Sequence, residues 1–371
     1  MVPVSEFVPL NMAFTIKVSI VVACRNEEAF IGDCLDSILA NDYPKDLLEV
    51  LVVDGVSDDG TRVIVESYSE RFPFVRLVDN PRRLASTAFN LGIQHAFGDV
   101  VMIMGAHSTY ATDYISRCVR ASTESGADNV GGIIRVMPRT PGLLGNALAF
   151  ALGHRFGVGN AHFRCETNRR RWADTVFGGC YRREVFEKVG LFNEQLVFNQ
   201  DIEFNLRLGR AGGRILLDPE IVSDYQARSD LKSFWKHNFR NGSWVVFSLL
   251  FCDGIPFSWR HLIPLGFVTA LVGFGTLSFI LPHFSWMFLG ISVSYLTASL
   301  IVSGAIAVRE RDFRYFVVMP LAFASLHVAY GLGSLTALVR TLVKRDLRGR
   351  AYRRILNNTV DRSPHSFLVK Q

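Results

Sequence analysis

Charged side chains are missing from two long stretches near the end of the sequence. Residues 262–308 and 315–339 contain no Asp, Glu, Lys or Arg. Buried helices of a soluble protein rarely run so far without a charge, which excludes a purely soluble protein. The runs 262–281, 285–308 and 315–339 each reach the roughly 20 residues that a membrane-spanning helix requires. We therefore expect a membrane domain of about three helices over residues 261–340.

The charged residues are divided unevenly along the chain. The first 261 residues carry 28 basic and 30 acidic side chains, and the last 110 carry 12 basic and 4 acidic ones. The positive excess flanks the apolar runs, where it suits a lipid bilayer with anionic headgroups, so nucleic acid is not an expected partner. The basic segments 236–260, 309–314 and 340–354 all favour the cytosolic side. Three membrane spans cannot place all three basic segments on the cytosolic side. Either the basic tail 341–371 lies outside the cytosol, or one apolar segment is re-entrant or interfacial.

Two further absences bear on the compartment. Residues 1–16, an N-terminal extension, have no basic side chain before Lys17 and no long apolar core, which does not resemble a signal peptide. We therefore expect a multi-pass protein of the inner or plasma membrane whose polar N-terminal domain stays in the cytosol. The six Cys residues form no C-x-x-C pair and have no His at zinc spacing, which favours buried free thiols in a reducing compartment.

Runs of β-branched residues alternate with helical patterns in the first hundred residues. Strands are expected at 17–23, 48–53, 75–78 and 100–104, with helices between them at 28–39, 61–71 and 86–97. This alternation predicts an α/β fold with a mostly parallel sheet and helices on both faces, followed by C-terminal transmembrane helices. Such sheets bind ligands beyond the carboxyl ends of their strands.

The pattern becomes less regular after residue 130. Residues 131–172 are rich in Gly, Arg and Asn, and we expect an irregular insertion there. Residues 235–260 mix aromatic, basic and apolar side chains. This mixture is typical of an amphipathic segment in the membrane interface, and a packed helix of the soluble domain is the alternative.

An acidic turn follows the second expected strand, with the sequence Asp54-Gly-Val-Ser-Asp-Asp-Gly-Thr61. Its small residues allow a ligand to approach, and Asp54 and Asp59 can accept hydrogen bonds from hydroxyl or imide N–H groups. The chain lacks a G-x-x-x-x-G-K-[ST] loop and has no G-x-G-x-x-G in its first turn. The acidic turn therefore indicates a ribose or base contact, or a helix start capped by Ser57 or Asp58.

Four motifs occur in a fixed order along the chain, at Val18–Glu28, Glu49–Thr61, Asn90–Asp99 and Asn199–Arg207. This series resembles family 2 glycosyltransferases. The resemblance implies a GT-A fold, with a Rossmann-like sheet, in a cytosolic catalytic domain over residues 17–234. It also implies inverting transfer from a nucleotide-sugar donor, for which we expect a UDP-sugar. Together with the membrane segments, Gly178–Gly190 is similar to the membrane-bound succinoglycan-type glucosyltransferases of exopolysaccharide synthesis.

The resemblance assigns the donor site to residues at the strand ends. Arg25, Glu27, Asp54 and Asp59 would hold the nucleoside, because carboxylates can accept from uracil N3–H or from ribose hydroxyls. Arg240 would clamp the diphosphate leaving group, since a guanidinium pairs bidentately with phosphate oxygens.

The sequence departs from the family at the metal position. The family has Asp-x-Asp, or Asp-Ala-His in the succinoglycan-like group, where this chain has Gly105-Ala106-His107. Gly105 thus stands where a carboxylate would contact the donor. His107 is the expected metal ligand, with a helix-start or substrate-facing His as the alternative. Imidazole suits Mn²⁺ better than Mg²⁺, and we expect one of these two cations with most of its ligands supplied by the diphosphate.

The resemblance makes Asp201 the catalytic base that deprotonates the acceptor hydroxyl, a role that calls for a partly desolvated carboxylate. A helix-start acid stabilised by the helix dipole is the alternative. Gly178, Gly179 and Gln200 are candidates for the acceptor side, although Gln200 stands where the family more often has Glu.

Three functions remain open at this point. The leading hypothesis is a membrane-bound enzyme that adds one sugar to a lipid-linked (polyprenyl) or glycan acceptor at the cytosolic membrane face, in polysaccharide or glycoconjugate biosynthesis. A processive polysaccharide synthase is less favoured, because the segment around Arg240 lacks the Gln and Trp of the Gln-x-x-Arg-Trp motif of such enzymes. A silent sugar-nucleotide-binding assembly subunit is the non-enzymatic alternative, suggested by Gly105 and Gln200.

Overall fold

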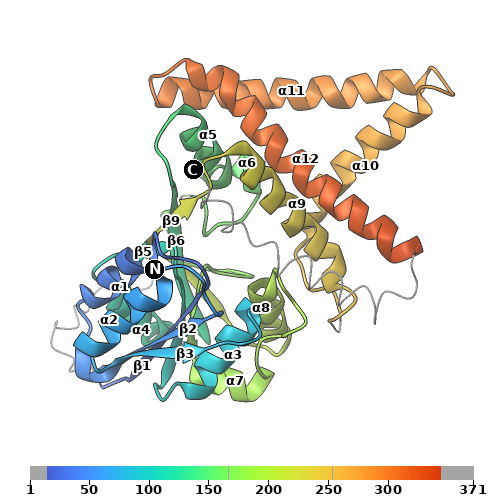
Figure 1. The fold of residues 1–371 in the computed structure, drawn as a ribbon. Helices are drawn as coiled ribbons and strands as arrows, with labels where there is room; N and C mark the ends of the chain where they lie inside the picture. The colour runs from blue at the N-terminus through green and yellow to red at the C-terminus, as the bar shows by residue number, and fades with distance from the viewer. Residues whose placement is uncertain (1–14, 166, 253, 344–371) are drawn as a thin grey trace, which may run out of the picture.

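A computed structural model describes residues 15–165, 167–252 and 254–343 (Figure 1). Its first half alternates strands with helices. The strands are β1 (Val18–Cys24), β2 (Leu48–Asp54), β3 (Val75–Asp79) and β4 (Val100–Gly105). The helices between them are α1 (Ile31–Leu39), the short 3₁₀ helix η1 (Lys45–Leu47), α2 (Thr61–Arg71) and α3 (Ala85–His95). The four strands pair in parallel, with β1 between β2 and β4. The predicted α/β alternation is confirmed.

The second half of the chain completes a mixed sheet. Its strands are β5 (Ser108–Tyr110), β6 (Asn129–Pro138), β7 (Arg171–Trp172), β8 (Cys180–Arg182) and β9 (Ile215–Ala227). In the described part of the chain the order is β3-β2-β1-β4-β8-β6-β9-β5, and β7 pairs with β9. Strand β8 runs antiparallel to β4 and β6, whereas β6 and β9 run parallel. Helices α4 (Tyr114–Ser125), α7 (Arg183–Val189) and α8 (Gln200–Arg210) accompany these strands.

Apolar side chains cover both faces of the sheet. All seven residues of β2 are buried, as expected for a strand with a helix layer on each side. Along β1, Ile20 and Val22 join the core beneath α1 and α4, and Val21 joins the core beneath α3 and α8. The six cysteines are free thiols, and all except Cys252 are buried.

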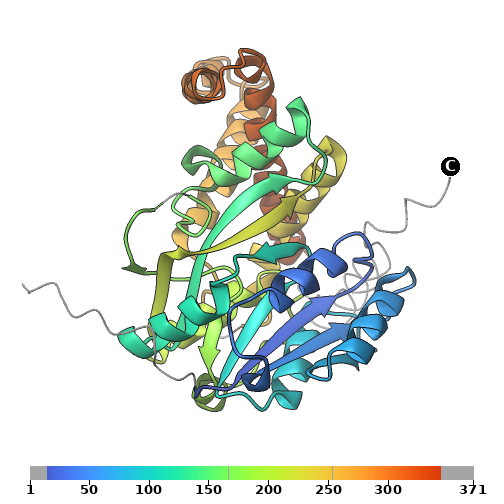
Figure 2. The same ribbon diagram turned by 90° about the vertical axis from the view of Figure 1, so that its left-hand side faces the viewer.

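Strands β6 and β9 extend beyond the sheet as a two-stranded arm, clearly visible in Figure 2. The arm leads to α5 (Leu143–Gly153), α6 (Arg155–Val158) and α9 (Leu231–Ser248). The expectation that residues 131–172 are irregular is therefore wrong for residues 131–158, while the described residues between α6 and β7 form neither a helix nor a strand. The glycines that suggested a loop are needed for close strand packing, since a Cβ on Gly132 would lie 1.8 Å from the carbonyl oxygen of Ile221.

Three long apolar helices follow the 3₁₀ turn η2 (Trp259–His261). They are α10 (Leu262–Leu277), α11 (Phe284–Arg309) and α12 (Arg314–Val343). The stretches Trp259–Leu277, Phe284–Arg309 and Arg314–Val343 are long and apolar enough to cross a membrane. Three such helices were expected, at 262–281, 285–308 and 315–339.

Helix α9 packs along α12 (Figure 1) through small residues. A Cβ on Gly242 would lie 2.0 Å from the carbonyl oxygen of Tyr330, and a Cβ on Gly333 would lie 2.0 Å from that of Phe239. Ser334 Oγ donates to the Gly242 carbonyl at 2.9 Å. Two helix backbones therefore touch directly, as small residues allow between membrane helices.

The domain limits stay predictions. Within the segment 235–260, residues up to Ser248 belong to α9, where Trp244 and Phe247 are buried, so this part is a packed helix. The extension 1–16 up to residue 14, and the tail 341–371 beyond Val343, lie outside the described residues.

Candidate active site

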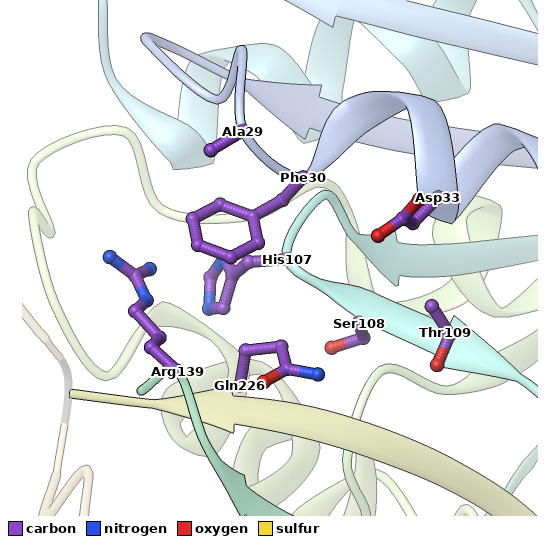
Figure 3. A pocket seen from close by; sticks show the side chains of 8 residues that line it. All are labelled: Ala29, Phe30, Asp33, His107, Ser108, Thr109, Arg139 and Gln226. Atoms are coloured by element: carbon purple, nitrogen blue, oxygen red, sulfur yellow. The ribbon is translucent and has the colours of Figure 1, made fainter. Parts of the chain in front are cut away.

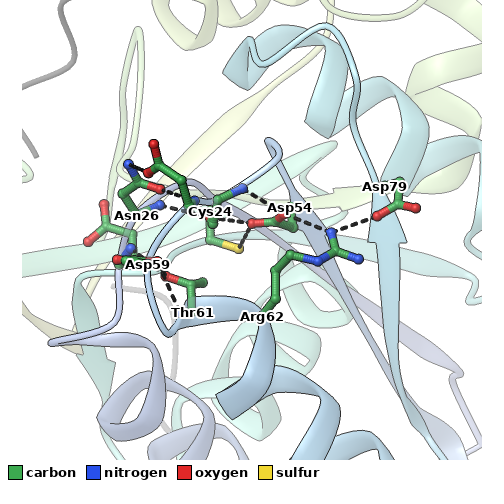
Figure 4. Close-up of polar contacts among 10 residues, drawn as sticks. Cys24, Asn26, Asp54, Asp59, Thr61, Arg62 and Asp79 are labelled. Atoms are coloured by element: carbon green, nitrogen blue, oxygen red, sulfur yellow. Dashed lines mark hydrogen bonds and ion pairs between the residues drawn. The ribbon is translucent and has the colours of Figure 1, made fainter. Parts of the chain in front are cut away.

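A buried carboxylate anchors the acidic turn after β2 (Figure 4). The Asp54 side chain is fully buried and accepts hydrogen bonds from the Ser57 amide at 3.0 Å and from the Ser57 hydroxyl. Arg62 of α2 reaches Asp54 at 2.9 Å and Asp79 at 2.7 Å. These hydrogen bonds, first with Asp79 and then with Asp54, raise the pKa of Arg62, so its guanidinium stays charged. Asp54 therefore holds the turn in shape, and its contact with a nucleoside stays a prediction.

Further hydrogen bonds join this turn to the loop after β1. The side chains of Asn26 and Asp58 are linked at 2.6 Å, and the Glu27 amide donates to the Thr61 hydroxyl at 2.8 Å. Partial burial alone would raise the pKa of Asp59, but hydrogen bonds from Thr61 and from the Glu28 amide lower it overall. Asp59 is therefore ionised at neutral pH.

The backbone at these loops is closely packed and locally strained. Val56 has φ 58°, a left-handed conformation that is costly for a β-branched residue and is often found at functional sites. A Cβ on Gly55 would lie 3.2 Å from the Cβ of Arg25, so Arg25 lies against the turn. The structure thus brings Arg25, Glu27, Asp54 and Asp59 together at one edge of the sheet.

His107 lies just past β4, beside the loop after β1. Its Nδ1 is 3.5 Å from Glu27 Oε1, and its ring meets the edge of the Tyr225 ring at a centroid distance of 5.1 Å. His107 also lines a pocket with Phe30 and Arg139 (Figure 3), where the Arg139 guanidinium lies 4.4 Å from the centre of the Phe30 ring. His107 therefore joins the nucleoside-side loops to the β6–β9 arm.

The residues at His107 fit a divalent cation only in part. Within the described ranges, no group of three or more His, Cys, Asp or Glu side chains is placed to hold a metal ion. His107 and Glu27 are one nitrogen and one carboxylate ligand side by side. A cation there would need several further oxygen ligands, and a diphosphate can supply them.

Gly105 is the last residue of β4, and Tyr110 holds its backbone. The Gly105 amide donates to the Tyr110 hydroxyl oxygen at 2.7 Å. A Cβ on Gly105 would meet its nearest neighbour, Ser108 Oγ, at 3.4 Å, which is an ordinary contact. The space at this position would therefore accept a side chain, and the missing carboxylate is not explained by crowding.

Asp201 lies in the first turn of α8 and is half-buried. Burial raises the pKa of its carboxyl, while backbone hydrogen bonds and the nearby Arg164 guanidinium lower it in part. The same Arg164 lies 5.5 Å from the centre of the Tyr225 ring, on which His107 also packs. Asp201 therefore interacts electrostatically with Arg164, which lies over the same Tyr225 ring as His107, and its role as the base stays a prediction.

The other acceptor-side candidates are Gln200, next to Asp201 in the chain, and the glycine pair before β8. Gln200 begins α8, and its Oε1 is buried with no hydrogen-bond partner among the described residues. Gly178 and Gly179 have φ of 67° and 113°, and a Cβ on Gly178 would lie 2.5 Å from the carbonyl oxygen of Ile103. The two glycines therefore let this loop lie against the end of β4, and an acceptor contact by them stays a prediction.

Helix α9 adds two basic side chains next to α8. The Arg240 guanidinium lies 5.2 Å from the Phe198 ring centre, and the His237 ring is 6.1 Å from the same ring. Burial, followed by the charges of Arg228, Arg164, Arg240 and His107, lowers the pKa of His237 well below its usual value. His237 is thus neutral, and Arg240 lies on the Asp201 side of the site.

Sequence reasoning missed Arg139, Arg228, Tyr225 and His237 as members of this site. Arg139 and Arg228 stand at the far ends of β6 and β9, which only the folded arm brings together. The sole local signal was the alternation of apolar and polar residues along Ile215–Ala227, which indicates a strand but no chemistry.

Residues 19–190 match the sequence model of the family described as Glycosyl transferase family 2. The chain therefore carries a family 2 glycosyltransferase domain and is a glycosyltransferase. The resemblance drawn from its motifs, and the GT-A fold that this implied, are confirmed.

Two relatives align over most of their length. One, from Methanococcus voltae, is a dolichyl N-acetyl-alpha-D-glucosaminyl phosphate 3-beta-D-2,3-diacetamido-2,3-dideoxy-beta-D-glucuronosyltransferase, 28% identical, with 87% of this chain and 97% of that protein covered. The other is the succinoglycan biosynthesis protein ExoA of Rhizobium meliloti, 29% identical, with 85% and 92% covered. A similar solved structure is mannosyltransferase PcManGT from Pyrobaculum calidifontis in complex with GDP-Man and Mn²⁺. Its TM-score is 0.58 at 22% identity, with 87% of this chain and 88% of that chain covered.

Proposed function

We propose that this glycosyltransferase adds one sugar, with inversion, from a nucleotide-diphosphate sugar to a lipid-linked acceptor at the cytosolic membrane face. The observation that carries the proposal is the position of Asp201. Its half-buried carboxylate has a raised pKa and connects through Arg164 and Tyr225 to the His107 end of the donor loops. A carboxylate with these properties is suited to take a proton from an alcohol.

The reaction needs one proton transfer and one displacement. Asp201 takes the proton of the acceptor hydroxyl while the hydroxyl oxygen attacks the anomeric carbon of the donor sugar. The bond from that carbon to the diphosphate oxygen breaks on the opposite face, which inverts the configuration, and the nucleoside diphosphate leaves with the bonding electrons. Arg240 would stabilise the negative charge on the diphosphate.

The donor would lie along the loops after β1 and β2. Arg25, Glu27 and Asp59 supply charged groups for the ribose and base, and Asp54 keeps the turn in shape beneath them. A divalent cation, Mn²⁺ or Mg²⁺, would neutralise the diphosphate, held on the protein side by His107 and Glu27. The GDP-Man and Mn²⁺ in the similar mannosyltransferase structure agree with this class of donor and cofactor. A UDP-sugar remains our expected donor.

The helices support an acceptor that is bound in the membrane. Helix α9 begins close to the site and packs on α12, which is long and apolar enough to span a bilayer. A lipid-linked acceptor would thus reach Asp201 from the bilayer side. The Methanococcus voltae relative is named for a dolichyl phosphate-linked sugar, which is an acceptor of this kind.

Product analysis tests the proposal. The full-length protein, purified into nanodiscs, is incubated with a panel of nucleotide sugars, with Mn²⁺ or Mg²⁺, and with polyprenyl phosphate and sugar-bearing polyprenyl phosphates as acceptors. We expect the product to gain a single sugar of inverted configuration. A ladder of products would show a processive synthase, and no transfer by a folded, nucleotide-binding protein would show a silent subunit.

A further inference from the structure

Three arginines from distant parts of the chain lie around the region of His107, Tyr225 and Asp201. Arg139 follows β6, Arg164 lies in the loop before β7, and Arg228 joins β9 to α9. Arg164 lies 5.4 Å from the Phe163 ring centre and 5.5 Å from that of Tyr225. Arg139 lies on the opposite side of the His107 region, over Phe30. We call Arg139, Arg164 and Arg228 the arginine cluster.

The members of the arginine cluster influence one another and their neighbours. Burial lowers the pKa of Arg139 and of Arg240, and the charge of Arg228 lowers both further. Burial lowers the pKa of Arg164 as well, while Asp201 acts in the opposite sense. All these guanidinium groups remain cationic at neutral pH. Several positive charges therefore lie near one another despite their mutual repulsion.

Protein carboxylates compensate this charge poorly. Among the described residues, no ion pair within 4.0 Å includes any member of the arginine cluster. The carboxylates that act on it at longer range are Glu27, Asp201 and Asp230, and Asp230 is already hydrogen-bonded to Ser233 as the cap of α9. The cluster therefore lacks a closely bound anion.

Two guanidinium nitrogens of the cluster also lack hydrogen bonds. Nη1 of Arg164 and Nε of Arg139 are buried, with no hydrogen-bond partner among the described residues. A buried donor without a partner costs about 1–3 kcal/mol, and more when it is charged. Such donors are expected where a ligand supplies the acceptor oxygens, and planar N–H groups match phosphate oxygens best.

The position of the cluster indicates which phosphate this is. Arg228 directly precedes α9, which lies against α12, and Arg164 acts on Asp201, whereas Asp54, Asp58 and Asp59 in the nucleoside loops already accept hydrogen bonds of their own. We propose that Arg139, Arg164 and Arg228 bind a phosphate group of the lipid-linked acceptor. This assignment rests on the proposed function. It makes the phosphate, rather than the lipid chain alone, the feature by which the enzyme recognises its acceptor.

The test compares two lipids and a nucleotide on the full-length protein in nanodiscs of uncharged phosphatidylcholine. We expect polyprenyl monophosphate to bind at least about tenfold more tightly than the polyprenol of equal length, as one charge-assisted hydrogen bond can provide. Arg228→Gln should weaken binding of polyprenyl monophosphate about tenfold or more and leave the affinity for UDP and GDP unchanged. Arg228→Lys should restore part of the loss.

Arg139→Gln is the second variant, in case Arg228→Gln does not fold. Arg120→Gln, on the exposed face of α4, is the matched control and should bind all three ligands as the wild type does. Equal affinity of the wild type for polyprenol and its phosphate would overturn the proposal. It would also be overturned if the variants lost UDP or GDP affinity instead, because the cluster would then bind the donor diphosphate.

The two proposals fail in different ways. Transfer to a phosphate-free acceptor at an undiminished rate would leave the glycosyltransferase proposal standing and overturn the phosphate site. A wild type that transfers no sugar from any donor would overturn the proposed function, and the lipid-binding comparison would still decide whether the cluster recognises phosphate.

Discussion

The two sides of the site differ in how their polar groups are satisfied. On the donor side, Asp54 and Asp59 accept hydrogen bonds from their own turn, Asp58 accepts one from the loop after β1, and Arg62 forms two ion pairs there. On the acceptor side, Arg139, Arg164 and Arg228 stand without a close carboxylate. The first side is organised before any ligand arrives. The second side has an excess of positive charge, which a bound anionic ligand would neutralise.

The difference has a structural origin. The donor side is built from loops between consecutive parallel strands, so its residues are close in sequence and can adapt to one another. The acceptor side is assembled from β6, β9, α8 and α9, which come from distant segments of the chain. Substitutions on the two sides of the site should therefore have separable effects.

Removal of the proposed base should have the largest effect. Asp201→Asn keeps the shape of the side chain but cannot take a proton, so transfer should fall by roughly 10²- to 10⁴-fold. The affinity for nucleotide should stay unchanged, because the donor side is complete in itself. Sugar transfer to a lipid acceptor and nucleotide binding are measured on the same preparation. Asp46→Asn, at an exposed acid of η1, is the control; substantial transfer by Asp201→Asn would refute the assignment.

The next largest effect is expected for His107→Ala, which should weaken the binding of the divalent cation. Loss of one of two protein ligands should lower the apparent Mn²⁺ affinity of donor binding by about 10- to 100-fold. The measurement is a Mn²⁺ titration of donor binding and of donor hydrolysis. His95→Ala, at an exposed His of α3, is the control. Donor hydrolysis that proceeds unchanged in the presence of a chelator would rule out His107 as a metal ligand.

Gly242→Ala should separate α9 from α12. The added Cβ would lie 2.0 Å from the Tyr330 carbonyl oxygen, and overpacking of this kind costs about 1–3 kcal/mol. The free energy of unfolding should fall, seen as a lower thermal unfolding temperature in one detergent. The matched variant is Gly266→Ala in α10, where a Cβ meets nothing within 4 Å, and it should be neutral. Equal effects of the two substitutions would mean that the two helices do not pack closely.

The smallest expected effect is that of Arg164→Gln on the pH dependence of kcat/KM. Transfer requires ionised Asp201, so kcat/KM should fall as the pH drops through the raised pKa of this carboxyl. Arg164→Gln removes a positive charge that lowers this pKa, so the acid limb should move to higher pH by up to about one unit. Profiles are compared after each is scaled to its own plateau. A limb that stays in place or moves to lower pH would show that Arg164 does not act on Asp201.

The N-terminal half of the fold could be predicted because its signals are local. The run Leu48–Asp54 is a fully buried strand, and such strands read as continuous β-branched runs. The Gly and Asp residues of the segment Asp54–Thr61 indicate a turn on their own. The grouping of Arg25, Glu27, Asp54 and Asp59 at one edge of the sheet could be predicted for the same reason, since each lies at the end of a strand or in the loop that follows it.

The arm could not be predicted, because its signals depend on partners far away in sequence. Gly131 and Gly132 suggest a loop on their own, yet both lie in β6, where side chains would strike Val176 and Ile221. The apolar stretch Leu143–Gly153 did offer a helix signal that was overlooked. The arginine cluster has no motif at all, since its charges become significant only when the arm and α9 bring them together.

The direct backbone contact of α9 with α12 has a geometric consequence. Because the two helix backbones touch, the proposed placement of α12 in a bilayer would let this contact and the β6–β9 arm fix the distance of Asp201 from the membrane. An acceptor glycan that grew longer would carry its terminal hydroxyl past that distance. Such an enzyme would select its acceptor by glycan length. It would accept a lipid-linked glycan of one length and leave longer ones to other enzymes.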